Sequence, residues 1–543
     1  MKITSLFLLI FLATTALFAQ NTPLGVLIEP VENATNIGGI QSFAYAQHNG
    51  KWLIISGRLD GLHQRMPFAA FDVDGNNNQL MVIDPETAEK WTAPLTSLSP
   101  SLQEQLSATN TQFFYENNYL YLTGGYGYSP SAGDHKTFEY ITAANVPAII
   151  EAVINGSTDF STFFRQVYDE NFAVTGGQLE KINNTFYLVG GHRFDGRYNP
   201  MGPDHGPGFS QEYTNEIRRF TLNDDGETLQ ITHLETWNDI AAFHRRDFNV
   251  LPKIMPNEEE GLVAFSGVFQ VNADLPFLNC VQIDSANYSV NNDFAQYYNH
   301  YHCANIPLYS QSNDEMHYLF FGGIAQYYDS LGVMVQDNDI PFVRTIARIS
   351  QTTDGDMHEY KLPVEMPSLL GAGSEFIANE NLSYYNNGVL KLDELSNDTT
   401  FVGYIFGGIS STAPNIFWIN DGTQSSTNQQ LFKVFITKSP TSTHSDALNQ
   451  QSNGHLQMQV YPNPNNGEFS LKFRLNSLSK VQLSLYDLQG NEVLSEKIKR
   501  KDLQIGDNIR SYQLQNLSYG SVYMLVLKTA QGQVVQKIII NPL

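Results

Sequence analysis

Hydrophobic positions in this chain fall into short runs separated by turn residues, and one kind of run recurs. Six times a hydrophobic strand leads into a small residue and a glycine, at intervals that are uneven but of similar size. The six runs are WLIISG ending at Gly57, YLYLTGG at Gly125, FYLVGG at Gly191, LVAFSG at Gly267, HYLFFGG at Gly323 and GYIFGG at Gly408. Such repetition indicates copies of one supersecondary unit packed against each other.

Each repeat predicts four antiparallel strands. A strand precedes the glycine strand through a tight turn at Asn49-Gly50, Asn117-Asn118 or Asn183-Asn184, and Asn and Gly tolerate the positive φ of hairpin turns. Further strands follow the glycine, as in NQLMVIDPETAEKW. Four strands repeated six times predict an all-β fold, a six-bladed β-propeller over residues 20–437, in which radial packing protects most sheet edges.

The two ends of the repeat region complement each other. The sixth repeat stops at LFKVFITKS (431–439) without a fourth strand, and PLGVLIEPV (23–31) precedes the first repeat. We expect the N-terminal segment to supply the outer strand of the sixth blade and close the ring.

The termini have different patterns. Met1-Lys2, an uncharged apolar run to Phe18 and Ala19 predict a signal peptide over 1–19. No other long apolar run occurs, so no membrane span is expected. Residues 438–454 are polar and predict a linker. Alternating strands from 455 to 543 predict a small Ig-like β-sandwich.

Charge separates the two folded parts. Residues from 455 onward carry 10 Lys/Arg and 6 Asp/Glu, a net +4, whereas residues 20–454 carry 20 basic and 49 acidic side chains, a net −29. The whole chain, at −24, would repel phosphate backbones, so nucleic acid is not an expected partner. The two cysteines, Cys280 and Cys303, either pair in a disulfide or remain as two buried free thiols.

The C-terminal segment contains a recognisable set of motifs. YPNPNNGEF, VQLSLYDLQGNEV and SYGSVYMLVLKTAQGQVVQKIII follow one another between positions 455 and 543. They closely resemble the type A sorting domain of the type IX secretion system of Bacteroidota. The resemblance implies the type IX machinery as a partner, and a product that is secreted or held on the cell surface, outside the outer membrane.

The repeat resembles the kelch and galactose-oxidase-like propellers, which have paired glycines after the second strand. The Gly57 and Gly267 repeats depart from that pattern with Ser-Gly, and the usual Trp of the fourth strand is evident mainly at Trp91 and Trp237. Copper radical chemistry on residues 297–303 and a calcium loop at Asp72 and Asp74 are minor alternatives. No cofactor is predicted.

Long connections predict the functional end of the propeller. Connections between second and third strands are long, as in residues 58–78 and 192–214, and such loops on a rigid scaffold concentrate binding groups. The predicted ligand-binding residues in or beside these loops are Arg58, Arg65, Arg165, His192, Arg193, Arg197, His205, His244, Arg245, Tyr298, His300 and His302. Each Arg has the alternative of a structural role between neighbouring blades.

These observations favour a binding protein over an enzyme. Guanidinium groups match carboxylates and hydroxyls, and aromatic rings pack on sugar faces. We therefore predict a glycan or another surface protein as the ligand. The alternatives are a sugar-active enzyme on the same face, such as a mutarotase, lyase or oxidase, and a structural component of the envelope. Fold alone does not decide between them.

Overall fold

The computed structural model describes most of the chain. The described residues are 24–32, 34–200, 208–255, 259–330, 333–395, 398–437, 457–461, 465, 467–475, 477–486, 492–514, 522–529 and 532–540. The predicted signal peptide, the predicted linker and His205 lie outside the described residues. The chain forms two compact units, Met1–Gln326 with Asp339–Ala447, and Tyr327–Asn338 with Leu448–Leu543.

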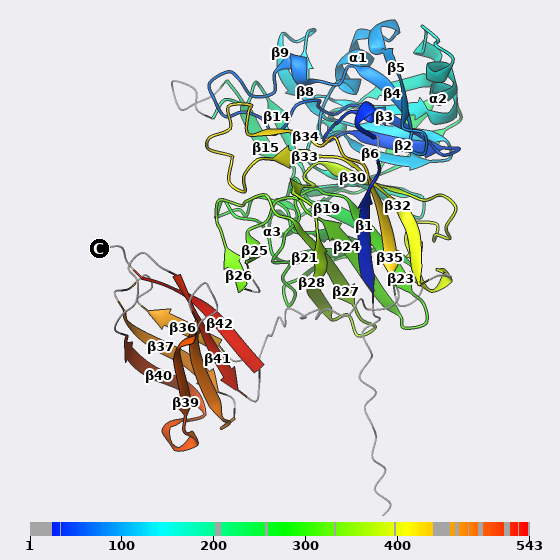
Figure 1. Cartoon of the computed structure of the whole chain (residues 1–543). Helices are drawn as coiled ribbons and strands as arrows, with labels where there is room; N and C mark the ends of the chain where they lie inside the picture. Colours follow the sequence, from blue (N-terminus) through cyan, green and yellow to red (C-terminus); the bar gives the residue numbers. More distant parts are fainter. Residues whose placement is uncertain are drawn as a thin grey trace, which may run out of the picture. The chain divides into compact units, whose positions relative to one another are not determined.

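The first unit contains six antiparallel sheets with four main strands each (Figure 1). The strands follow chain order in five of these sheets, and the sixth is completed by the N-terminal strand. Sheet 1 is β2 (Ala44–His48), β3 (Lys51–Ile55), β4 (Gln79–Asp84) and β5 (Glu89–Pro94); sheet 2 is β6 (Gln112–Glu116), β7 (Tyr119–Thr123), β10 (Tyr140–Asn145) and β11 (Phe164–Tyr168); sheet 3 is β12 (Gln178–Ile182), β13 (Thr185–Val189), β16 (Glu216–Asp224) and β17 (Leu229–His233). Sheet 4 is β19 (Asn249–Ile254), β20 (Glu260–Phe265), β21 (Cys280–Ile283) and β22 (Tyr288–Asn291); sheet 5 is β23 (Asn305–Ser310), β24 (Glu315–Phe321), β27 (Thr345–Gln351) and β28 (Met357–Glu365); sheet 6 is β30 (Ser374–Ala378), β32 (Thr399–Gly407), β35 (Phe432–Thr437) and β1 (Gly25–Pro30).

Smaller elements lie in the connections. The additional strands are β8 (Tyr126–Ser129), β9 (Asp134–Thr137), β14 (His192–Asp195), β15 (Ser210–Tyr213), β18 (Trp237–Asn238), β25 (Tyr327–Ser330), β26 (Val333–Gln336), β29 (Leu369–Leu370), β31 (Leu390–Lys391), β33 (Ile409–Ser411) and β34 (Ser425–Thr427). The α-helices are α1 (Pro100–Leu106), α2 (Val146–Ile154) and α3 (Ile240–Phe243).

The N-terminal strand completes the sixth sheet, as the sequence predicts. β1 pairs antiparallel with β35, from Gly25 opposite Thr437 to Pro30 opposite Phe432, and Figure 1 shows β1 in blue beside β35 in yellow. Val26 is 6% exposed in the core, and its neighbour Leu27 is 39% exposed. The alternation of the strand therefore buries Val26 in a cluster that also contains Leu362 of β28 in sheet 5, and leaves Leu27 on the exposed face.

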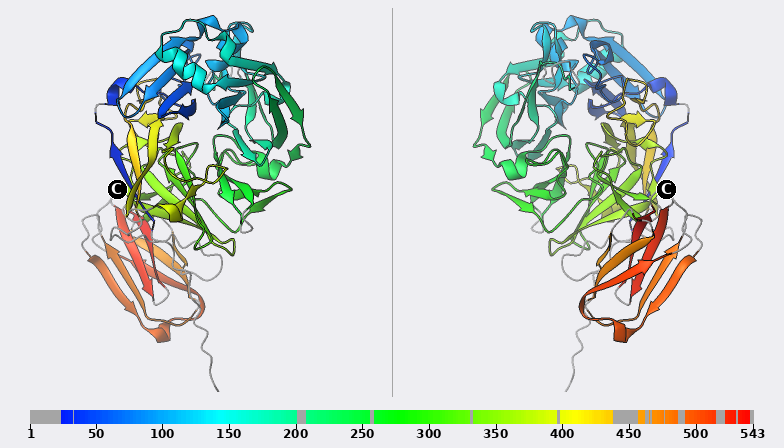
Figure 2. Two further views of the ribbon diagram at one scale, coloured as in Figure 1. Left: turned by 90° about the vertical axis from the view of Figure 1, so that its right-hand side faces the viewer. Right: turned by 90° about the vertical axis from the view of Figure 1, so that its left-hand side faces the viewer.

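The six sheets stand around a common axis in a propeller-like ring (Figure 2). The first strand of each sheet is the innermost. Backbone bonds tie the starts of these strands together: the N–H groups of Ser42, Asn110, Asp247 and Gly373 donate to the carbonyls of Gly373, Ser42, Gly176 and His302 at 2.7–3.2 Å. We call residues 42, 110, 176, 247, 302 and 373 the inner ring.

The repeat glycines make a second set of bonds between sheets. The N–H of Gly125 donates to Val174 O at 2.9 Å, and that of Gly191 to Arg245 O at 2.7 Å. Gly124 has φ +61°, and a Cβ there would collide with Val174 O. Ser56 and Ser266 take the place of the first glycine with φ 64° and 54°. The paired glycines are therefore required because the next sheet approaches their backbone closely.

The C-terminal unit contains two further sheets. One is β36 (Gln457–Tyr461), β37 (Glu468–Leu475) and β40 (Gly506–Gln513); the other is β39 (Glu492–Ile498), β38 (Val481–Tyr486), β41 (Val522–Thr529) and β42 (Gly532–Ile539). Phe469 and Leu471 from the first sheet share one buried cluster with Leu483 and Leu525 from the second. Two antiparallel sheets thus enclose this core between them. Among the described residues, no helix combines the length and the apolar character that crossing a membrane requires.

Candidate functional site

The connections between second and third strands, together with those from sheet to sheet, lie where the inner strands begin. We call this the long-loop end. The connections at this end include residues 56–78, 124–139, 190–215 and 408–431. The opposite end has mostly short turns, as the sequence predicts, with two exceptions: residues 146–163, which contain α2, and residues 379–398.

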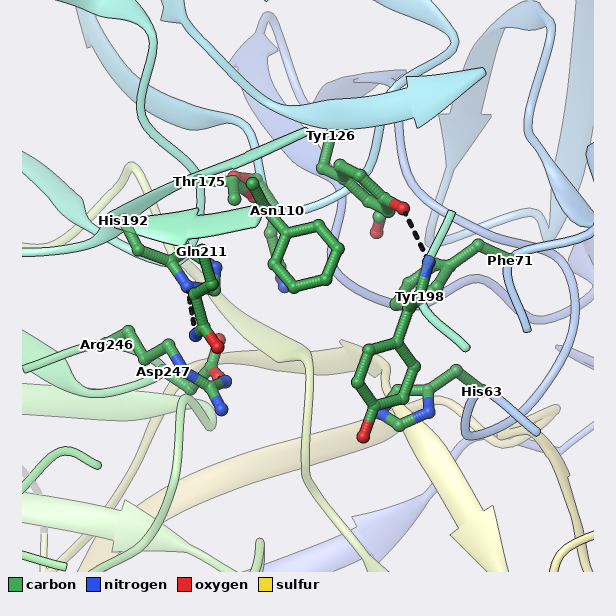
Figure 3. A pocket seen from close by; sticks show the side chains of 12 residues that line it. His63, Phe71, Asn110, Tyr126, Thr175, His192, Tyr198, Gln211, Arg246 and Asp247 are labelled. Carbon is green, nitrogen blue, oxygen red and sulfur yellow. Dashed lines mark hydrogen bonds and ion pairs between the residues drawn. The ribbon is translucent and has the colours of Figure 1, made fainter. Parts of the chain in front are cut away.

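A pocket of about 130 Å³ lies at the long-loop end, above the inner ring (Figure 3). We call it the long-loop pocket. Its lining comes from sheets 1 to 4 and their connections: His63, Phe71, Thr109, Asn110, Tyr126, Thr175, His192, Phe194, Tyr198, Gln211, Arg246 and Asp247.

One wall of the long-loop pocket is aromatic. The His63 ring lies 5.1 Å from Phe71 and 4.9 Å from Tyr198, centroid to centroid, and Phe71 lies 5.1 Å from Tyr126. The Tyr126 hydroxyl donates to Gly196 O at 2.7 Å and accepts from the Tyr198 N–H at 3.2 Å. These bonds fix the wall before any ligand arrives, so little ordering is left for binding.

The opposite wall is polar and carries little net charge. His192 Nδ1 lies 2.7 Å from Gln211 Nε2, and Arg246 forms an ion pair with Asp247. Burial lowers the pKa of His63 to about 4 and that of His192 well below its usual value. Both imidazoles are therefore neutral at pH 7. His192 Nδ1 accepts from the Gln211 amide, so the Nε2–H group of His192 remains as a donor.

Three predicted arginines are paired within the loops of the long-loop end. Arg58, 2% exposed, reaches both carboxylate oxygens of Asp60 and the side chain of Asn76. Arg193 pairs with Asp195 at 2.6 Å. Arg197 donates to Ala70 O at 2.9 Å and lies near Asp72. These guanidinium groups hold loop conformations.

Two other arginines lie away from the long-loop pocket. Arg165 is in β11 near the opposite end, where both oxygens of Asp224 accept from it at 2.5 and 2.7 Å. Arg245 is 1% exposed and donates to the carbonyls of Ala242, Ser266 and Asn279 at 2.6–3.1 Å. Burial lowers the pKa of Arg245 to about 9.

The remaining predicted residues are spread over several environments. Arg65 lies over the Trp418 ring at 4.3 Å, on the surface of the long-loop end. His244 stacks on Tyr213 at 3.8 Å, while Tyr298 and His300 are 1% and 0% exposed. His302 bonds Glu375 at 3.0 Å and lines a different cavity, between the inner strands. Only His192, among the predicted residues that the structure describes, lines the long-loop pocket.

The two cysteines are free and buried. Cys280 and Cys303 belong to one apolar cluster, and burial raises the pKa of each thiol to about 12. Of the two alternatives open at the sequence level, the structure therefore has the buried thiols.

The sequence prediction, which selected mainly charged residues of the long loops, does not include most residues of the long-loop pocket. Tyr126 and His192 each follow directly after a repeat glycine, and each is bridged to a residue shortly before an inner strand, Thr109 and Thr175 respectively. The repeat itself is the usable signal, because these equivalent positions face the axis at the long-loop end. Among the described residues, no group of three or more His, Cys, Asp or Glu side chains could hold a metal ion.

Comparisons with known proteins identify the C-terminal segment. Residues 459–541 match the family model described as "Secretion system C-terminal sorting domain". This match confirms the predicted type IX sorting domain. It directs export to the cell surface or outside the cell and implies interaction with the type IX secretion machinery.

Two solved structures show a distant similarity to the chain. The structure described as "Structure of YjhT" is 11% identical, with a TM-score of 0.34, and the match covers 59% of this chain and 83% of that chain. The structure described as "Cryo-EM structure of RAG in complex with one melted RSS and one unmelted RSS" is 9% identical, with a TM-score of 0.36, covering 75% and 99%. No curated protein matches the chain.

Proposed function

We propose that this protein is an exported six-bladed, kelch-like β-propeller that binds a glycan in its long-loop pocket. In this proposal residues 1–19 are a signal peptide, 20–437 the propeller, 438–454 a linker and 455–543 an Ig-like sorting domain. The tail takes the propeller to the cell exterior, where glycans of surfaces and polymers are available to it.

The observation that carries the proposal is the pairing of an aromatic wall with a polar wall in one small pocket. Phe71 and Tyr198 line the pocket with aromatic rings that can contact the C–H groups of a sugar, and His192 and Gln211 bring hydrogen-bonding groups on the other side. A volume of about 130 Å³ is below the roughly 300–1,000 Å³ of pockets for drug-sized ligands. The pocket therefore suits a single ring or chain end.

The charged groups in and around the pocket indicate which sugars it would bind. Arg58, Arg193 and Arg197 of the surrounding loops are paired with carboxylates, and the pocket histidines are uncharged at neutral pH. An anion would find no unpaired cation among the described residues that line the pocket, since Arg246 already pairs with Asp247. We therefore expect uncharged sugars to bind more tightly than acidic ones.

A glycan array and isothermal titration with the full chain test this proposal. Tyr198→Ala removes part of the aromatic wall and should weaken a bound neutral glycan at least about tenfold, as expected from the loss of one buried contact of about 1.4 kcal/mol. Tyr168→Ala is the matched control, because Tyr168 is 58% exposed and does not line the pocket.

The possible results distinguish binding in the pocket from binding elsewhere and from catalysis. Saturable binding that Tyr198→Ala weakens and Tyr168→Ala leaves unchanged supports the proposal. Binding that both variants leave unchanged would place the glycan elsewhere on the chain, and conversion of the ligand during titration would favour the enzyme alternative.

A further inference from the structure

A second cavity lies between the inner strands of the ring. It has a volume of about 300 Å³, and we call it the channel cavity. All six sheets contribute to it: Tyr45 comes from β2, Phe113 from β6, Glu180 from β12, Val250 from β19, Ile306 from β23 and Glu375 from β30. At the end opposite the long loops it is bordered by Tyr384 and Gly388 of the connection 379–398.

That connection is fastened across neighbouring sheets. β31 pairs in parallel with β23 of sheet 5, and Asn387 Nδ2 donates to Lys253 O of sheet 4 at 3.0 Å. The border of the channel cavity is therefore held in place by these bonds rather than left to a free loop.

Two carboxylates face the channel cavity from opposite halves of the chain. Glu375 has a partner, because its Oε1 lies 3.0 Å from His302 Nε2. Glu180 has no hydrogen-bond or ion-pair partner within the part of the chain that the structure describes. Burial, and then the charge of Glu375, raise the pKa of Glu180 to about 8.

The other lining groups supply no cation that would favour the ionised form of Glu180. None of the described residues that line the channel cavity is Lys or Arg. The titratable side chains that face Glu180 from the other strands and the bordering connection are Glu375, His302, Tyr45 and Tyr384. The hydrogen bond to Glu375 raises the pKa of His302 against the lowering effect of burial. Glu375 therefore has a partner in His302, whereas Glu180 has none among the described residues.

Apolar surface lies beside the unpaired carboxylate. Phe113, Val250, Ile306 and Pro307 line the same cavity, whereas the amide of Asn249 is occupied by bonds to His300 O and the Cys303 N–H. A ligand held here would meet the Glu180 carboxyl group and an apolar wall. That combination fits a cationic head on an apolar body.

We propose that the channel cavity is a binding site for a small primary amine with an apolar body, whose ammonium group pairs with the Glu180 carboxylate. The site is separate from the long-loop pocket and does not depend on the glycan proposal.

The proposal predicts a pH dependence of definite sign. Below about pH 8 the empty site holds Glu180 protonated, and an ammonium group binds the carboxylate form. Binding must then release a proton, so affinity rises as the pH increases from 6 to 8.5. The amine itself stays charged over that range, because its pKa is close to that of Lys, about 10.4.

Isothermal titration with the full chain and three probes of one shape tests the proposal. The probes are 2-phenylethylamine, 2-phenylethanol and 3-phenylpropionate, at pH 6 and 8.5. We expect the amine to bind at least about tenfold more tightly than the alcohol, and the carboxylate not to bind. Titrations of the amine in two buffers of different ionisation enthalpy should show proton release in the unsubstituted protein.

Glu180→Gln should lower the affinity for the amine at least about tenfold and abolish the proton release. The affinity for the alcohol should stay unchanged. Glu212→Gln, an exposed carboxylate on β15, is the matched control and should change nothing. Tyr198→Ala should also leave amine binding intact. Equal affinities for the three probes, or amine binding without proton release, would overturn the proposal even if Glu180→Gln failed to fold.

Discussion

The long-loop pocket and the channel cavity lie on either side of the inner ring and are built from different material. Connections from sheets 1 to 4 make most of the pocket, and the inner strands of all six sheets make the cavity. In the pocket, charges such as Arg246 and Asp247 pair with each other. In the cavity, Glu180 is left without a partner among the described residues.

This difference has a physical cause. A loop can rearrange until its charged groups find partners, as Arg58 and Arg197 do in the connections 58–78 and 190–215. A strand fixes the direction of each side chain by its alternation, so a carboxylate that points to the axis stays there. A carboxyl group without a partner in a rigid strand is therefore the stronger indication of a ligand.

Opening the ring should have the largest effect, because the channel cavity requires all six sheets. Val26→Asp places a carboxylate in the core of sheet 6, and we expect a loss of about 3–5 kcal/mol in the free energy of unfolding. Leu27→Asp, on the exposed face of the same strand, should cost under about 1 kcal/mol. Urea unfolding measures both, and equal losses would mean that β1 does not bury a face.

Removing the buried side chain of Arg245 should have the second-largest effect on stability. Arg245→Ala leaves the carbonyls of Ala242, Ser266 and Asn279 without their donor, and should lower the free energy of unfolding by about 3 kcal/mol. Ligand binding by the protein that remains folded should be unaltered. If this variant instead kept its stability and lost glycan affinity, Arg245 would belong to the binding machinery.

The two sites should respond to pH in opposite directions. The folded-state pKa of Glu180, about 8, exceeds the unfolded value, so its contribution is present at low pH and lost as the pH rises from about 4.5 to 8. His63, with a folded-state pKa of about 4, contributes above pH 6.5 and loses that contribution as the pH falls towards 4.

Urea unfolding across pH 4 to 9 measures these contributions. Glu180→Gln should remove the decline in stability between about pH 4.5 and 8. His63→Gln should remove a decline on the acid side. The assignment would be wrong if Glu180→Gln changed the decline in stability at acid pH, or if His63→Gln changed the decline towards pH 8.

Substitutions in the exposed ion pairs of the loops should have the smallest effect on stability. Arg193 is 38% exposed in its pair with Asp195, so Arg193→Ala should change the free energy of unfolding by under about 1 kcal/mol. Thermal unfolding checks this directly. A drop comparable to that of Arg245→Ala would mean that surface pairs, too, determine the shape of the long-loop pocket.

Several features were predictable from local sequence because their causes are local. The repeat glycines mark positions with positive φ and close backbone approach, so they revealed the sheets and their order. The missing fourth strand of the last repeat predicted the pairing of β1 with β35. The alternating strands and motifs of the C-terminal segment identified the sorting domain.

Only the tertiary structure decided which groups face a ligand. In the sequence, Arg165 and Arg197 resemble residues that bind anions, but Arg165 pairs with Asp224 and Arg197 with Asp72, both far away along the chain. Glu180 and Glu375 are far apart in the sequence and look like ordinary strand residues, yet closure of the ring brings their charges together in one cavity. Partners and burial are properties of the closed ring, and a linear pattern does not contain them.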